Sequence, residues 1–220
     1  MKKIKSLSAV VICLCLIAGV FAGCSKISLE GQWKTSYDLS EELNKYCDMT
    51  SDPDYGEFYD VFNEQLTVDV IYTFDSDNRY TVTVDEDKLK SDLDSFTDKF
   101  INYLIEGMYK YGESEGIDRS EFDELYKEAN GVSMFDDARS DSDADLAELY
   151  NEIIDIYTEN ETKNTVIEKD RFYVTDADGN KTKYETFTLE GDVLTISGAY
   201  DMNDNPIGDE RYPLVLTKIA

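Results

Sequence analysis

Two periods of apolar residues divide the chain into strand-like and helix-like regions. Where apolar and polar residues alternate, the pattern predicts strands with one buried and one wet face. Eight segments have this pattern: residues 32–38, 66–74, 80–84, 165–169, 171–175, 184–189, 193–197 and 212–219. Turn-forming residues separate most of them, as in Asp178-Gly179-Asn180. The segments therefore predict a sheet built mainly from hairpins.

Between residues 86 and 158 the apolar period changes to three or four. One stripe predicts a long helix that Gly112 terminates, and its members are Leu89, Leu93, Phe96, Phe100, Leu104 and Met108. Asp118 and Glu121 have the spacing of a capping box and predict a second helix that ends before Gly131. Residues 143–157 predict a third helix, and residues 39–47 a short separate one.

The order of these segments predicts a mainly β fold with an α insertion. An even number of up-and-down strands brings the first and last strands side by side and antiparallel, which removes exposed sheet edges. We therefore expect an eight-stranded up-and-down barrel over residues 31–220. Three helices, at 86–158, would be inserted between its third and fourth strands.

The first 23 residues have the pattern of an export signal. Three lysines come first, and residues 7–21 then carry no charge, which is too short a run for a transmembrane helix. Ala22 and Gly23 precede Cys24, and this resembles the bacterial lipobox, whose cysteine is lipidated and becomes the mature N-terminus. The resemblance implies a cleaved signal peptide at 1–23 and a lipidated tether at 24–30. Ser25 is not the aspartate of an inner-membrane retention signal, so the outer membrane of a two-membrane cell is permitted.

Gly31-Gln32-Trp33 at the start of the first strand resembles the Gly-x-Trp motif of lipocalins. Together with eight strands it makes the chain similar to lipocalin-like (calycin) barrels, and in particular to uncharacterised bacterial lipoproteins of that plan. The resemblance implies that Trp33 packs at the closed end of the barrel under a basic residue of the last strand. Lys218 fits that role better than Arg211, because an antiparallel pairing of the first and last strands places residue 218 near Trp33.

Composition excludes several classes of function. The chain has 48 acidic residues, 21 basic residues and a net charge of −27, which becomes −30 when the three leader lysines are removed. Such a charge repels nucleic acid, so none is expected as a partner. The absence of histidine excludes Ser-His-Asp and Cys-His catalysis and histidine-ligated zinc. Outside the leader and Cys24, only Cys47 remains, and its helical spacing from Leu43 predicts a buried thiol.

Three clusters suggest sites. Asp141, Asp143, Asp145 and Glu152 have part of the spacing of a calcium loop, but Leu146 stands where that loop needs glycine, so we favour an acidic helix N-terminus. Aromatic residues on the inner strand faces predict a packed barrel interior rather than a cavity for an apolar ligand. A tyrosine cluster suited to protein contact is expected on the long helix, comprising Tyr103, Tyr109 and Tyr111.

The sequence thus predicts a lipid-anchored protein on the extracytoplasmic face of a cell membrane, acting as a non-enzymatic binding or interaction module. A protein partner would contact the helical insertion. The alternatives are a carrier of a small apolar ligand in the barrel and a carboxylate-dependent cell-wall enzyme. Cys24 is the assigned lipidation site, and we assign no catalytic residue, metal ligand or cofactor.

Overall fold

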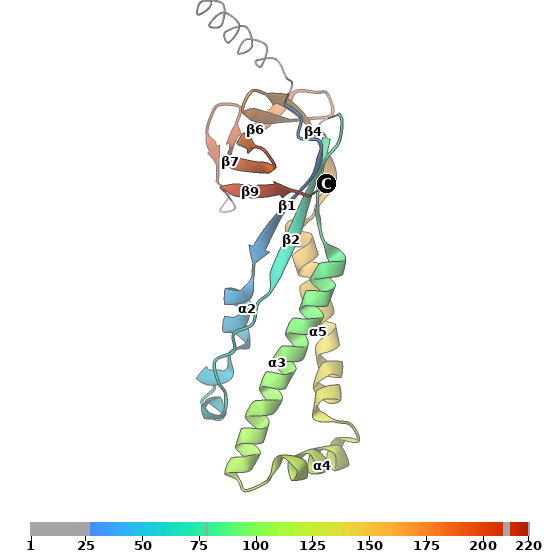
Figure 1. Cartoon of the computed structure of the whole chain (residues 1–220), viewed down its shortest axis with the longest axis vertical. Helices are drawn as coiled ribbons and strands as arrows, with labels where there is room; N and C mark the ends of the chain where they lie inside the picture. Colours follow the sequence, from blue (N-terminus) through green and yellow to red (C-terminus); the bar gives the residue numbers. More distant parts are fainter. Residues whose placement is uncertain (1–26, 78, 209–211, 220) are drawn as a thin grey trace, which may run out of the picture.

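A closed β-barrel lies at one end of the molecule, and a stalk of helices extends from the barrel to the opposite end of the molecule (Figure 1). The computed structural model describes residues 27–77, 79–208 and 212–219. The predicted signal peptide, Cys24 and Arg211 lie outside these residues. The described chain begins at the end of the barrel that is opposite the stalk.

Eight antiparallel strands form the barrel, as the alternating segments predict. They are β1 (Gly31–Asp38), β2 (Thr67–Phe74), β3 (Arg79–Val84), β4 (Glu159–Glu168), β5 (Arg171–Thr175), β6 (Lys181–Glu190), β7 (Val193–Asp201) and β9 (Leu214–Lys218). A two-residue strand, β8 (Pro206–Ile207), pairs with β7 and lies outside the eight predicted segments. This closed antiparallel barrel is consistent with a lipocalin-like fold.

The barrel closes because β9 pairs with both β1 and β7, and β6 pairs with β7. Each of these pairings is antiparallel. The predicted pairing of the first and last strands is therefore confirmed. Register shifts between Tyr80 and Val82 in β3, and between Thr186 and Phe187 in β6, interrupt the ladders. Such bulges bend a strand and increase its local twist, which helps a small sheet close.

The connection between β3 and β4 is helical, as predicted, and contains α3 (Glu86–Ser114), α4 (Arg119–Asn130) and α5 (Met134–Tyr157). The short helix α2 (Ser40–Cys47) lies between β1 and β2, so the described residues hold four α-helices in all. Two single turns, Met49–Ser51 and Gly56–Phe58, follow α2. In Figure 1, α3 and α5 run side by side away from the barrel, and α4 crosses the far end of the stalk.

Two helix boundaries differ from the sequence prediction. Helix α3 continues through Gly112 to Ser114, and Gly112 instead gives room to a neighbouring ring, since a Cβ there would lie 2.6 Å from Cδ2 of Phe122. Helix α5 begins at Met134 rather than at 143, because Ser133 caps it by accepting a hydrogen bond from the Asp136 amide at 3.1 Å. The residues Asp118 and Gly131 cap α4 as predicted, Gly131 with φ of 81°.

The buried apolar residues form two clusters. The larger one fills the barrel and continues into the upper stalk, where Leu89 and Leu93 of α3 and Ile153 of α5 pack below the strands. The smaller one holds the far end of the stalk together through Ile101, Ile105 and Met134. The stalk is therefore fixed to the barrel by a continuous core rather than by a linker.

Candidate functional site

The interior of the barrel is packed with aromatic rings, as their inner-face positions predict. Trp33 and Phe172 are each 1% exposed, and the Phe172 ring lies 5.9 Å from that of Phe187 and 6.3 Å from that of Phe74. A cavity of about 60 Å³ remains near the stalk-facing end, which is far below the 300–1,000 Å³ of typical ligand pockets. The described part of the barrel therefore has no space for a drug-sized apolar ligand.

Glu185 lines this cavity, and the sequence pattern had not singled it out as a candidate site residue. Glu185 is 7% exposed, and burial raises its pKa, while Lys183, Lys163 and a hydrogen bond from Tyr212 oppose the increase. Glu185 lies two residues before Phe187 in the same strand, so the alternation that places Phe187 inside also places Glu185 there. The cavity around this carboxyl group is too small to admit a polymer of the cell wall.

Trp33 lies where the lipocalin resemblance places it. It pairs in register with Lys218, whose ammonium lies 5.3 Å from the centre of the indole ring. The indole Nε1 donates a 2.7 Å hydrogen bond to the carbonyl of Leu29, which is itself fully buried. The residues just before β1 are thus held against the barrel end that lies away from the stalk (Figure 1).

The run from Asp141 to Glu152 does not form a calcium loop, because all of it is helical within α5. Asp141 and Asp145 are four residues apart and share a face of the helix, but Asp143 points to nearly the opposite side, so the three carboxylates do not converge. The interpretation as a helix N-terminus is also wrong, since α5 begins at Met134. Among the described residues, no three His, Cys, Asp or Glu side chains are grouped so that they could hold a metal ion.

The predicted tyrosine cluster on α3 is dispersed. The hydroxyl of Tyr103 accepts a hydrogen bond from the Met49 amide at 3.0 Å, and that of Tyr109 donates to Asp123 at 2.7 Å. Only Tyr111 of the three is an exposed side chain, and it is 40% exposed. Tyr103 and Tyr111 contact the segment that follows α2 and Tyr109 contacts α4, so the three do not form one exposed contact surface.

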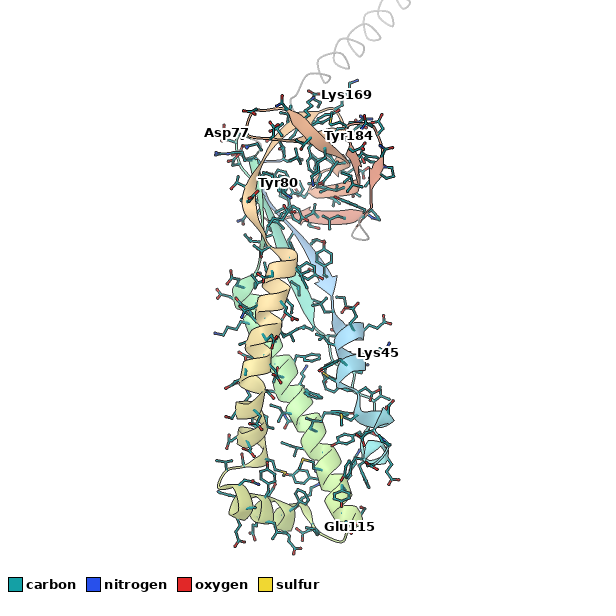
Figure 2. The ribbon with its side chains drawn as sticks, turned by 180° about the vertical axis from the view of Figure 1, so that it is seen from behind. Lys45, Asp77, Tyr80, Glu115, Lys169 and Tyr184 are labelled. Atoms are coloured by element: carbon teal, nitrogen blue, oxygen red, sulfur yellow. The ribbon has the colours of Figure 1, made fainter. Side chains whose placement is uncertain are left out.

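The stalk contains a groove with a volume of about 550 Å³. Helix α3 forms its floor, and α2 and α5 form its two walls, as can be followed in Figure 2. We call it the stalk groove, and its lining residues are Leu43, Tyr46, Cys47, Phe96, Thr97, Phe100, Ser142, Asp145, Leu146, Glu148, Leu149 and Glu152. The apolar faces of these helices were predictable from the spacing of their residues, whereas the distance between the two walls was not.

The floor of the stalk groove is apolar and its α5 wall is acidic. Phe96 and Cys47 are buried at its base, where Phe100 and the two leucines of α5 are partly buried. Asp145, Glu148 and Glu152 are exposed along the α5 wall, and the lining contains no lysine or arginine. An apolar floor beside a row of carboxylates favours a ligand that is both apolar and cationic.

Cys47 of α2 is a structural part of the groove. It is 8% exposed, and burial raises its pKa to about 11, so the thiol is protonated at physiological pH. A nucleophilic cysteine needs the opposite shift, towards the thiolate. The prediction of a buried Cys47 is confirmed.

The chain matches no protein-family model, no curated protein and no solved structure in the three comparisons made with known proteins. None of the helices that the structure describes combines the length and apolar character that a membrane crossing requires.

Proposed function

We propose that this protein is a lipid-anchored, extracytoplasmic interaction module that holds its helical stalk away from the membrane. Lipid on Cys24 would attach it to the outer face of a cell membrane, and the stalk would bind a protein partner without catalysing a reaction. In this proposal the barrel is the lipocalin-like base of a bacterial lipoprotein. The observation that supports it best is that the described residues just before β1 and the stalk lie at opposite ends of the barrel.

Chain geometry limits how far the barrel can stand from the bilayer. Leu29 is buried against the barrel and lies only five positions after Cys24, so a fully extended tether spans at most about 18 Å. Helix α3 has 29 residues and is therefore about 43 Å long. With lipid on Cys24, the stalk groove would face the solvent beyond the barrel.

The packed barrel argues against the two alternative functions. A carrier of an apolar ligand needs an internal cavity of several hundred Å³, and the cavity beside Glu185 has about 60 Å³. A cell-wall glycosidase needs two carboxyl groups on either side of an accessible bond. The buried Glu185 and the neighbouring Glu159 line that same small cavity.

Metabolic labelling with a fatty acid tests the anchor. The wild-type chain should be labelled and should sediment with membranes, whereas Cys24→Ala should be unlabelled and should not sediment. A Cys47→Ala variant is the matched control and should be labelled like the wild type, because Cys47 is buried in the fold. Equal labelling of the wild type and Cys24→Ala would contradict the proposal.

A quenching experiment tests the orientation. Figure 2 labels Asp77 at the barrel end and Glu115 at the far end of the stalk, and both side chains are exposed. A fluorophore attached to Asp77→Cys should be quenched by a lipid-borne quencher in vesicles, and one attached to Glu115→Cys should not. The proposed orientation is wrong if Glu115→Cys is the more strongly quenched variant.

A further inference from the structure

The charge along the stalk groove is of one sign. From Ser140 to its end at Tyr157, α5 contains no lysine or arginine and six acidic residues, namely Asp141, Asp143, Asp145, Glu148, Glu152 and Asp155. The nearest cation on this helix, Arg139, is bound to Asp94 and Asp98 of α3 at 2.6 and 3.1 Å and lines a different hollow. The carboxylates on the groove wall therefore have no cation of α5 beside them.

The opposite wall adds no compensating charge. Lys45 is the one basic residue of α2, and it lines another hollow together with Val61 and Glu64. In Figure 2 its side chain points away from α5. The potential at the groove is thus negative along its length, and a basic partner would supply the missing charge.

Large apolar side chains are exposed at the edges of the groove. Tyr46 of α2, which lines the groove, is 89% exposed. Ile156 lies four residues after Glu152 on the same face of α5 and is 68% exposed. Exposed apolar residues beside an apolar hollow are typical of an interaction surface. They extend the apolar floor at two points where a partner would cover it.

The geometry points to a basic amphipathic helix of a partner protein as the occupant of the stalk groove. Its apolar side chains would pack on Phe96 and Phe100, and its lysines or arginines would lie along Asp145, Glu148 and Glu152. This inference rests on the proposed function and names the class of partner. A helix fits better than an extended strand, because the groove is walled by helices and has no open sheet edge for a strand to join.

A designed peptide provides a direct test. The probe is a synthetic helix of about four turns, with leucines at i, i+3, i+4 and i+7 and lysines on the flanks. The full chain in neutral phosphatidylcholine vesicles should bind it, as measured by fluorescence anisotropy, and binding should weaken as salt increases. A peptide with glutamate at every lysine position should not bind. A lysine peptide whose leucines are scrambled off one face should bind much more weakly.

Substitutions locate the binding to the groove. The triple variant Asp145→Asn, Glu148→Gln, Glu152→Gln should lower the affinity for the basic peptide about tenfold, since each exposed charge pair contributes a few-fold. The matched control, Glu115→Gln, Glu124→Gln, Glu128→Gln, changes the net charge equally at exposed positions away from the groove and should leave the affinity within about twofold. Tyr46→Ala should weaken binding several-fold, whereas Val61→Ala, 72% exposed in the other hollow, should not.

The outcomes separate this inference from the anchor. A chain that carries lipid on Cys24 but binds basic and acidic peptides equally overturns the inference and leaves the anchor standing. A chain without lipid that binds the basic peptide through the groove overturns the anchor alone. Self-association that the groove variants abolish would also overturn the inference, because the occupant of the groove would then be a second copy of the chain. Equal weakening of peptide binding by the control triple variant would overturn it too, because the peptide would then bind the acidic surface as a whole.

Discussion

Trp33 and Lys218 face each other across the seam where the first and last strands of the barrel meet. The two residues are register partners, and the Lys218 ammonium lies 5.3 Å from the centre of the indole ring. The indole N–H is satisfied by the Leu29 carbonyl, so the ring closes the barrel without leaving a buried donor unpaired. Trp33 therefore contacts both the closing strand, through Lys218, and the residues just before β1, through Leu29.

Trp33→Ala should lower the free energy of unfolding by about 3–5 kcal/mol, the usual effect of emptying a buried aromatic site. Urea unfolding followed by circular dichroism measures this change. Lys218→Ala should cost about 0.5–1 kcal/mol, because the ammonium is partly solvated. Trp33 is also the one tryptophan of the chain, so the folded protein should have blue-shifted emission. Emission typical of water-exposed indole in the folded state would contradict the structure.

Asp69 should make the junction of barrel and stalk sensitive to acid. Its side chain is 5% exposed; burial alone would raise its pKa, but hydrogen bonds from Ser36 and Lys34, with the charge of Lys88, lower it. A carboxyl group with a lowered pKa in the folded state stabilises the fold above its unfolded pKa of about 3.9, and this contribution is lost as the pH falls through the folded pKa.

Asp69→Asn should therefore cost about 1–3 kcal/mol at neutral pH and progressively less below about pH 4. Chemical denaturation of both proteins across the acidic range measures the difference. The control is Asp77→Asn, since Asp77 is a 75% exposed carboxylate, and it should change stability little at any pH. A constant difference between the wild type and Asp69→Asn at every pH would show that the charge of Asp69 plays no part.

The strands were predictable because each has one wet face, so the alternation of apolar and polar residues survives in the sequence. The start of α5 was not predictable, since residues 134–142 are mostly acidic residues and serines, with a weak apolar period. The available signal was Ser133 with Asp136 three residues later, which is the spacing of a helix cap. Without that start, Asp141 and Asp143 were placed at a helix N-terminus instead of in its middle.

The stalk groove could not be predicted in the same way. Its apolar members belong to helical stripes, among them those that were identified on α3 and in residues 39–47. How far α2 stands from α5 is decided by the β1–β2 ribbon and the turns that follow α2, which are long-range contacts that no local period records. The candidate site is therefore a property of tertiary packing.

Gly107→Ala should destabilise the far half of the stalk by about 1–3 kcal/mol. A Cβ at this position would overlap the ring of Tyr59, which packs directly on the helix backbone. Thermal unfolding measures the loss, and Gly208→Ala, with open space around its Cβ position, is the control that should be neutral. Tyr59→Ala should lower the stability less in the Gly107→Ala variant than in the wild type, because removing the ring also removes the overlap. Strict additivity would show that Tyr59 does not pack there.

Calcium and magnesium should raise the melting temperature equally when they are compared at matched ionic strength. Counterions screen the repulsion within a chain of net charge −27, and screening depends on ionic strength rather than on the identity of the cation. A calcium site would instead stabilise the folded state selectively. The continuous helix α5 places Asp143 on the opposite side from Asp141 and Asp145, so the three do not form a calcium site and Glu152→Gln should leave both melting shifts unchanged. A large shift with calcium alone, abolished by Glu152→Gln, would mean that α5 unwinds to bind the ion.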